Sequence, residues 1–394
     1  MQLTMISNFI NHHQIPFSNA CYALLKEDYH FIQTEPMEEE RLEMGWSAAG
    51  ERLPYVHLLY EQEAVCERLI MDSDVLLVGW TKREDLIARR LQAGKATIRI
   101  SERLYREGQW KMVSPRGLLQ KYRDHTRYRK QPVCLLCAGA YVPSDFHLVH
   151  AYPGKMFRWG YFPETRSYTK EQWNSLKNTS GTVQIVWAGR FIPLKHPEYV
   201  IQLAEELRQA GYDFHIHMAG SGELEQSLKQ AAVEKKVTDT ITFHGFCTPE
   251  QVRSIMEKSH IHLFTSNRLE GWGAVVNEAM NSGCAEVVNV QVGAAPYLIR
   301  QGINGLVYPD NSYSEMVKAI RFLLDHPKER SNMGLAAYET IRQEWNAEHA
   351  AAELIRFAAG LLEGRIAPAK QGPLSPAPII APGKMLSYMK RREE

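Results

Sequence analysis

The chain has 394 residues, of which 44% are hydrophobic and 23% are charged, the balance of an ordinary soluble globular protein. This length exceeds what one hydrophobic core usually organises, so we expect two domains. No stretch reaches the roughly 18 apolar residues that a membrane-spanning helix requires. The six cysteines and the lack of a secretory leader predict a cytoplasmic protein with reduced thiols.

The net charge of +1 is unevenly distributed. Residues 1–81 carry 4 Lys/Arg and 13 Asp/Glu, whereas the segment from Lys82 to Lys130 carries 15 and 5. A basic segment of this density can serve phosphate groups or make peripheral contact with the anionic inner face of the membrane. The alternative is a solvated surface that pairs with the acidic segment, and the sequence leaves both open.

Short apolar runs alternate with helical patterns along the chain, which predicts parallel sheets flanked by helices, the α/β class. In the first half we expect strands at 3–7, 74–80, 97–100 and 133–137, and a helix at 83–94. The fourth of these strands contains Cys134 and Cys137. We interpret both cysteines as core residues, because no second Cys/His pair stands nearby to complete a metal site.

The second half alternates more clearly. We expect strands at 183–188, 213–219, 241–245, 261–265 and 286–290, and helices at 197–210, 224–234, 249–258, 274–282, 314–325 and within 333–357. This order predicts a second doubly wound domain of the nucleotide-binding kind. Residues 367–394 are rich in proline and end in a basic run, so we expect a flexible, solvated tail.

Two loops of the second half follow predicted strands, at the edge where doubly wound sheets bind ligands. Gly189 is followed by Arg190 and Lys195, which would bring two positive charges to that edge. Gly220 and Gly222 would form a turn with room for a phosphate. Taken singly each loop is weak evidence, because basic residues and tight turns often follow strands without a function.

A third loop is more specific. Glu270, Gly271, Trp272 and Gly273 precede a helix that contains Glu278. The glycines free backbone amides, and the start of the helix adds partial positive charge suited to a diphosphate. One carboxylate could accept hydrogen bonds from sugar hydroxyls and the other from ribose hydroxyls. The alternative is a capped helix with a solvated Glu278.

From residue 183 to 357 the chain resembles the nucleotide-binding domain of the family-four glycosyltransferases, also called glycosyl transferases group 1. In the first half, the loop at residues 8–14 resembles that of bacterial members that build capsular or exported polysaccharides. The ordered series of the three loops carries the resemblance, together with Gly293 and the run from Gly302 to Pro309.

The resemblance implies the GT-B architecture, in which two Rossmann-like doubly wound domains face a cleft and a C-terminal helix crosses back to the N-terminal domain. The domains expected from it are an acceptor domain at 1–165, a nucleotide-sugar donor domain at 166–345, the crossing helix at 346–366 and the flexible tail at 367–394.

The resemblance also implies a retaining, hexosyltransferase-like enzyme that moves a sugar from a nucleotide diphosphate donor to a hydroxyl of a glycan or lipid-linked acceptor. It implies no cofactor, no bound metal and no nucleic-acid partner. Arg190 and Lys195 would neutralise the leaving diphosphate, Glu270 would hold the donor sugar, and Glu278 the ribose. A non-hydrolysing sugar-nucleotide epimerase and a non-catalytic nucleotide-sugar-binding subunit are the alternatives.

The first half resembles the family in pattern only. His12 and His13 follow the first strand, where an acceptor should approach the donor phosphate. Either histidine could contact phosphate or steer an acceptor hydroxyl, or both could simply be exposed. Glu102 and Arg103 fall where relatives contact the donor sugar, and they could equally form a local ion pair.

Overall fold

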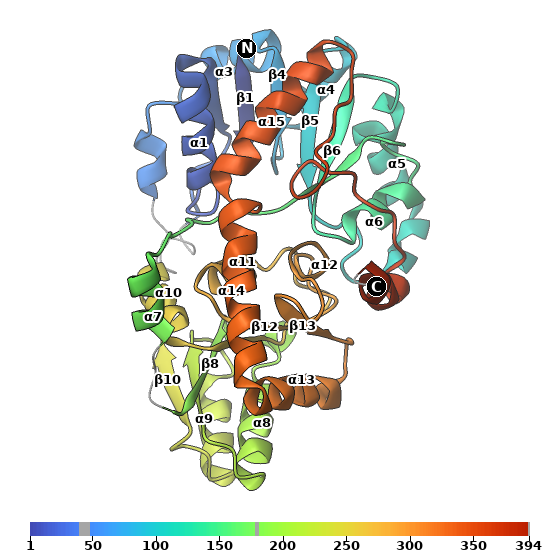
Figure 1. Cartoon of the computed structure of the whole chain (residues 1–394). Helices are drawn as coiled ribbons and strands as arrows, with labels where there is room; N and C mark the ends of the chain where they lie inside the picture. The colour runs from blue at the N-terminus through green and yellow to red at the C-terminus, as the bar shows by residue number, and fades with distance from the viewer. Residues whose placement is uncertain (39–47, 178–180, 393–394) are drawn as a thin grey trace. The chain divides into compact units, whose positions relative to one another are not determined.

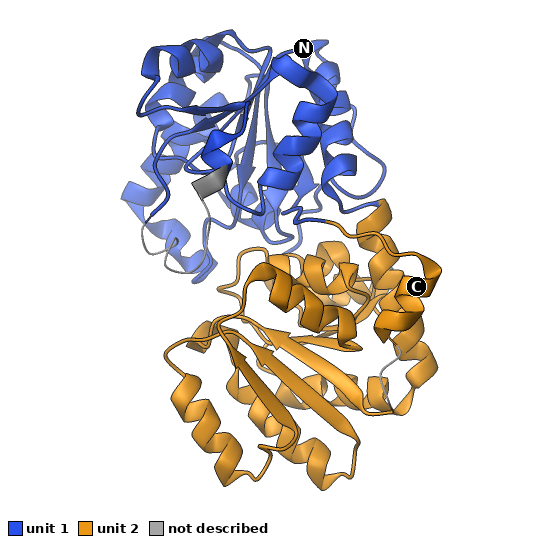
Figure 2. Ribbon diagram, turned by 90° about the vertical axis from the view of Figure 1, so that its left-hand side faces the viewer, with its two compact units in different colours: residues 1–164, 344–381 blue, residues 165–343, 382–394 orange. Residues whose placement is uncertain are grey.

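The computed structural model describes residues 1–38, 48–177 and 181–392, which form two compact units (Figure 2). Unit 1 comprises Met1–Glu164 and Glu344–Ala381, and unit 2 comprises Thr165–Gln343 and Pro382–Glu394. Every helix in the described ranges is too short or too polar to cross a membrane. The last two residues of the expected tail, 393 and 394, lie outside the described residues.

Unit 1 contains a seven-stranded parallel sheet among its described residues, in the order β3-β2-β1-β4-β5-β6-β7. The strands are β1 (Leu3–Ser7), β2 (Tyr29–Gln33), β3 (Val56–Leu58), β4 (Val75–Val78), β5 (Thr97–Ser101), β6 (Val133–Ala138) and β7 (Met156–Trp159). The strand order reverses between β1 and β4, which makes this a doubly wound sheet. Cys134 and Cys137 are buried in β6, as expected.

Helices cover this sheet (Figure 1). They are α1 (Ile15–Leu25), α3 (Glu63–Asp72), α4 (Glu84–Gln92), α5 (Pro115–Asp124), α6 (Val142–Leu148) and α15 (Ala347–Leu362), with the short 3-10 turn η3 (Gln109–Val113) before α5. Asn346 caps the start of α15 by accepting a hydrogen bond from the His349 amide. The helix α15 packs on α1, which confirms the prediction that a C-terminal helix returns to the N-terminal domain.

Unit 2 contains a six-stranded parallel sheet among its described residues, in the order β10-β9-β8-β11-β12-β13. The strands are β8 (Val183–Ala188), β9 (Phe214–Ala219), β10 (Ile241–Gly245), β11 (Ile261–Phe264), β12 (Ala285–Asn289) and β13 (Gly305–Tyr308). The helices are α7 (Lys170–Lys177), α8 (Glu198–Gln209), α9 (Glu225–Glu234), α10 (Pro249–Lys258), α11 (Ala274–Asn281), α12 (Ala295–Leu298), α13 (Tyr313–Asp325), α14 (Pro327–Gln343) and α16 (Met385–Arg392). The prediction of two Rossmann-like domains is confirmed.

The segment that we expected to be a flexible tail is instead packed along part of its length. Leu374 is fully buried, and its amide donates to the Arg158 carbonyl at 2.8 Å. Pro376 forms an antiparallel bridge with Phe157 of β7. Met385 of α16 is buried as well, so the expectation of a solvated terminus is wrong for these residues. For Leu374 and Pro376 the physical reason is the open edge of β7, which offers backbone groups that an extended segment can satisfy.

Candidate functional site

The three loops singled out in the sequence lie at one edge of the sheet of unit 2. The strand β8 pairs with β9 on one side and with β11 on the other, all three parallel. Gly189 follows β8, Gly220 follows β9, and the stretch 270–273 follows β11 and leads into α11. Because the three strands are parallel neighbours, their carboxyl ends bring the three loops together at the position where doubly wound sheets bind ligands.

The first two loops pack backbone against backbone. A Cβ atom built on Gly220 would lie 1.9 Å from the carbonyl oxygen of Gly189, and one on Gly222 would lie 2.7 Å from that of Phe191. Both glycines also have positive φ, +139° and +153°. Glycine is therefore required at both positions, because no side chain fits the space or the backbone conformation.

Lys195 and Glu270 form an ion pair at this edge. The Lys195 Nζ lies 2.5 Å from the Glu270 Oε2 and 4.9 Å from the centroid of the Phe264 ring. The two side chains are 14% and 16% exposed, so the pair is shielded but reachable. Thr265 fixes the lysine backbone, because its Oγ1 donates to the Lys195 carbonyl at 2.5 Å.

Two further basic residues belong to the same loop after β8. Arg190 is exposed and forms no ion pair with any residue that the structure describes. His196 was not predicted as a site residue, yet its Nδ1 lies 2.8 Å from the Glu198 Oε1. That hydrogen bond raises the pKa of His196, which increases the positive charge at this edge near neutral pH.

The start of α11 supplies backbone amides. Gly273 has φ +89°, and a Cβ there would lie 3.0 Å from both Phe264 and Val292. Trp272 is 1% exposed, and its indole nitrogen donates to the Asn277 Oδ1 at 2.8 Å. The tryptophan side chain is thus part of the core, and only its backbone could reach a ligand. Sequence reasoning could not separate the two uses of this residue.

Glu278 lies one turn into α11 and is partly buried. Burial raises the pKa of its carboxyl to about 7, although Arg253 and His262 act in the opposite direction. Arg253 of α10 also donates to Asn281, which ties α10 to α11. No local pattern around Glu278 predicts this raised pKa, because its burial depends on packing between helices.

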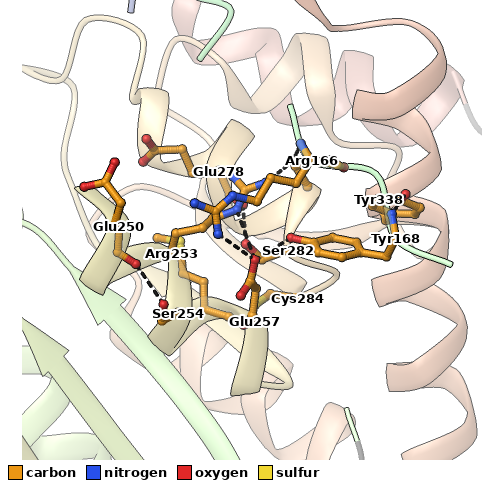
Figure 3. A network of polar contacts seen from close by, with 12 residues as sticks. Arg166, Tyr168, Glu250, Arg253, Ser254, Glu257, Glu278, Ser282, Cys284 and Tyr338 are labelled. Carbon is orange, nitrogen blue, oxygen red and sulfur yellow. Dashed lines mark hydrogen bonds and ion pairs between the residues drawn. The ribbon is translucent and has the colours of Figure 1, made fainter. Parts of the chain in front are cut away.

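The polar network around Arg253 also anchors the entry to unit 2 (Figure 3). Glu257 of α10 accepts from the Arg166 guanidinium at 2.9 Å and from the Tyr168 hydroxyl at 2.6 Å. The Tyr168 amide donates to the Tyr338 hydroxyl at 2.9 Å. The network therefore fixes the position of α10 and α11, the helix that carries Glu278.

A hollow of about 400 Å³ lies between the end of β10 and the start of α10, at the carboxyl edge of the sheet of unit 2. Its lining includes Phe246, which is 57% exposed, and Cys247. Thr248 caps α10 through a capping box with Gln251. The exposed aromatic ring gives this hollow a flat apolar surface.

Unit 1 has a cavity of its own, of about 1010 Å³, at the carboxyl ends of β1, β4, β5, β6 and β7. His13, Glu102 and Arg103 all line it. The ring of His12 lies 3.9 Å from that of His13. Burial and this neighbour lower the pKa of His13 to about 3, so its imidazole is neutral and suits a hydroxyl better than a phosphate.

The alternative of an ion pair between Glu102 and Arg103 is wrong. Glu102 accepts from Arg106 and from the Tyr161 hydroxyl instead. The Arg103 Nε lies 3.3 Å from the Asp145 Oδ2, and these two side chains are 4% and 0% exposed. Asp145 lies 42 residues after Arg103 in the sequence, so no local pattern could reveal this pairing.

Comparison with known proteins places this edge in context. Residues 169–340 match the family profile described as glycosyl transferases group 1. The chain is 30% identical over 149 residues to an α-D-kanosaminyltransferase of Streptomyces kanamyceticus, which covers 38% of each protein. It is 24% identical over 169 residues to the amylovoran biosynthesis glycosyltransferase of Erwinia amylovora, which covers 42% of this chain and 41% of that relative. The chain thus matches less than half the length of these relatives.

A solved structure is similar over most of the chain. HepE of Anabaena, in complex with UDP, superposes with a TM-score of 0.66 at 12% sequence identity. The superposition covers 90% of this chain and 100% of the other. At this identity the likeness concerns the fold.

Proposed function

The protein belongs to the glycosyl transferases group 1 family through residues 169–340 and has the GT-B architecture, and from this premise we propose that it is a retaining glycosyltransferase. Its donor is a nucleotide diphosphate sugar, and its acceptor is a hydroxyl of a glycan or lipid-linked saccharide. The amylovoran relative supports a place in polysaccharide biosynthesis.

The ion pair between Lys195 and Glu270 is the observation that carries the proposal. It joins a permanent cation and a carboxylate 2.5 Å apart, at the carboxyl ends of β8 and β11 and beside the start of α11. A bound donor would separate the two charges: phosphate oxygens would take Lys195, and sugar hydroxyls would take Glu270. Arg190 and the amides of residues 271–273 would add donors on the phosphate side.

The proposed reaction develops negative charge on the leaving diphosphate. The bond from the anomeric carbon to the phosphate oxygen breaks, and a bond to the acceptor oxygen forms on the same face. The acceptor proton passes to the departing phosphate oxygen, and the anomeric configuration is retained. Pre-aimed cations and amides stabilise such charge, each being worth about 3–4 kcal/mol, so the proposal includes no metal ion.

The remaining parts of the substrates fit other features. Glu278 would accept hydrogen bonds from the ribose, and the hollow beside Phe246 would take the base. The cavity of unit 1 would take the acceptor, with the neutral His13 positioned to hydrogen-bond a hydroxyl.

A thermal-shift series with UDP, GDP, ADP, TDP and CMP tests the donor site on the wild type and on Glu278→Ala. A ligand at about 100 times its Kd should add about 2.7 kcal/mol to the free energy of unfolding. A shift with one diphosphate that shrinks in Glu278→Ala is expected and would name the base. No shift with any nucleotide would contradict the proposed donor site.

Incubation of the matching sugar nucleotide with and without saccharide acceptors then separates the activities. The proposed transferase should convert the donor only when an acceptor is present. Conversion of the donor to an isomer without an acceptor would identify an epimerase. Binding without turnover on any acceptor would identify a nucleotide-sugar-binding subunit.

A further inference from the structure

The basic segment from Lys82 to Lys130 divides into two parts. The first part pairs with the acidic segment, as Arg83 does with Glu63 and Arg89 with Glu67. Residues 106–130 are different, with eight Lys/Arg against two Asp/Glu. Six of these cations form no ion pair with any residue in the described ranges: Arg116, Lys121, Arg123, Arg127, Arg129 and Lys130. Pairing with the acidic segment therefore explains only the first part.

The same segment exposes large apolar side chains. Trp110 is 69% exposed and Val113 is 74% exposed, both in η3. In α5, which has no buried residue, Leu118, Leu119 and Tyr122 are 39%, 50% and 56% exposed. We call the surface formed by these five side chains the η3–α5 face. An isolated exposed leucine is ordinary, but five exposed apolar side chains within 13 residues are more than scattered surface residues require.

The arrangement of α5 separates this face from the acceptor cavity. At about 100° per residue, Leu118, Leu119 and Tyr122 form one stripe of the helix. Gln120, Lys121 and Asp124 fall on the other side, and these three line the cavity of unit 1. Arg116 and Arg123 border the apolar stripe. One helix thus has an apolar stripe edged by cations on one side and a wall of the cavity on the other.

We infer that the η3–α5 face docks on an anionic lipid bilayer. Tryptophan, tyrosine and leucine are the side chains that enter the interfacial region, while arginine and lysine bind the lipid phosphates. A short amphipathic surface of this kind lies in the plane of the interface. The inference goes beyond the proposed function, and it makes a lipid-linked acceptor accessible to the cavity behind α5.

Vesicle sedimentation of the full chain tests the inference. Vesicles of phosphatidylcholine with and without phosphatidylglycerol are compared, and we expect at least tenfold tighter partition to the anionic ones. Each cation near the surface contributes about 1 kcal/mol, or about fivefold, so R116E/R123E should lower the partition more than tenfold. L118Q/L119Q should lower it to a similar extent.

Matched variants away from this face serve as controls. Leu335 of α14 is 46% exposed and the Arg365 side chain is 72% exposed, so L335Q and R365E should partition like the wild type. Equal binding to neutral and anionic vesicles, or an unchanged partition of both double variants, would overturn the inference. Binding of an acidic protein but not of vesicles would overturn it as well.

The nucleotide shift of each variant is measured in parallel. Because the proposed donor site lies in unit 2, an intact shift shows that unit 2 of a variant is folded, and an unchanged circular-dichroism melting curve without ligand shows that unit 1 is folded as well. A lost partition with an intact shift concerns the η3–α5 face alone, whereas a chain that binds vesicles without any nucleotide shift contradicts only the proposed function.

Discussion

Lys195 and Lys229 have the same two kinds of neighbour, a glutamate carboxylate and a phenylalanine ring. The Lys229 Nζ lies 2.7 Å from the Glu225 Oε1 and 5.9 Å from the centroid of the Phe243 ring. The difference is location: Lys229 is on the outside of α9 with its side chain 52% exposed, whereas Lys195 stands at the edge of the sheet. Lys229 therefore serves as a control for Lys195, because it makes the same kinds of contact away from the candidate site.

Lys195→Ala should lower kcat by about 10²–10³, because a pre-aimed donor to the leaving group is typically worth about 3–4 kcal/mol. Lys229→Ala should leave kcat within twofold of the wild type, since an exposed helical ion pair contributes about 0.3–0.5 kcal/mol to stability. Steady-state kinetics with the donor from the thermal-shift series makes the comparison. Equal losses in the two variants would show that Lys195 has no special part in the reaction.

Donor affinity should depend on pH through Glu278. If the ribose binds the ionised carboxylate, a pKa of about 7 makes the Kd for the nucleotide about tenfold weaker at pH 6 than at pH 8. Glu278→Gln should bind weakly, with the pH dependence that remains coming from the nucleotide and the other groups. Isothermal titration over this range tests both, and identical pH profiles in the two proteins would remove Glu278 from the donor site.

The same carboxyl should make the fold more stable in mild acid. Burial raises the folded-state pKa from 4.5 to about 7, so the folded state holds the proton between these values while the unfolded chain releases it. The free energy of unfolding should therefore fall as the pH rises through this window, by at most about 3 kcal/mol. Urea unfolding of Glu278→Gln should lack this component, and the exposed Glu234→Gln should keep it.

Gly220→Ala should be among the most disruptive single substitutions in unit 2. The added Cβ would lie 1.9 Å from the Gly189 carbonyl oxygen, and the backbone at residue 220 has a positive φ that alanine disfavours. We therefore expect the free energy of unfolding to fall by more than about 4 kcal/mol. Gly211→Ala meets no atom within 4 Å, and its φ of +78° alone should cost about 1–2 kcal/mol. Thermal unfolding would contradict this ranking if both variants melted at the same temperature.

Leu374→Ala should destabilise unit 1, although the residue lies in a proline-rich segment. The side chain is fully buried, and truncation of a buried leucine costs about 2–5 kcal/mol. Ile379 is 47% exposed, so Ile379→Ala should stay within about 0.5 kcal/mol of the wild type. Chemical denaturation of both variants checks the difference. An unchanged free energy of unfolding in Leu374→Ala would show that this segment does not stabilise unit 1.

The sequence alone predicted the strands with continuous apolar runs and missed those without them. The strand β3 has only three residues, and β7 reads Met-Phe-Arg-Trp, so neither shows a clear period. The strand β2 was missed because His30 and Gln33 interrupt its apolar run, and β13 because its short apolar run follows directly on a glycine.

The candidate site was predictable where its residues sit in short motifs. Lys195 and Glu270 were both expected, but their 2.5 Å pairing spans 75 residues and depends on the sheet order. The same limit applies to Arg103 and Asp145, and to the raised pKa of Glu278. Packing far along the chain sets these properties, and no local spacing encodes them.

Unit 1 is discontinuous in sequence, and this has a consequence for the order in which the protein matures on the ribosome. The main segment of unit 2, Thr165–Gln343, is unbroken and is synthesised before α15 and the segment around Leu374 exist. Until those residues emerge, α1 and the edge of β7 lack their covers. At about 5–20 residues per second the delay lasts many seconds, so the unit whose translation begins first cannot be completed until after the main segment of unit 2 has been made.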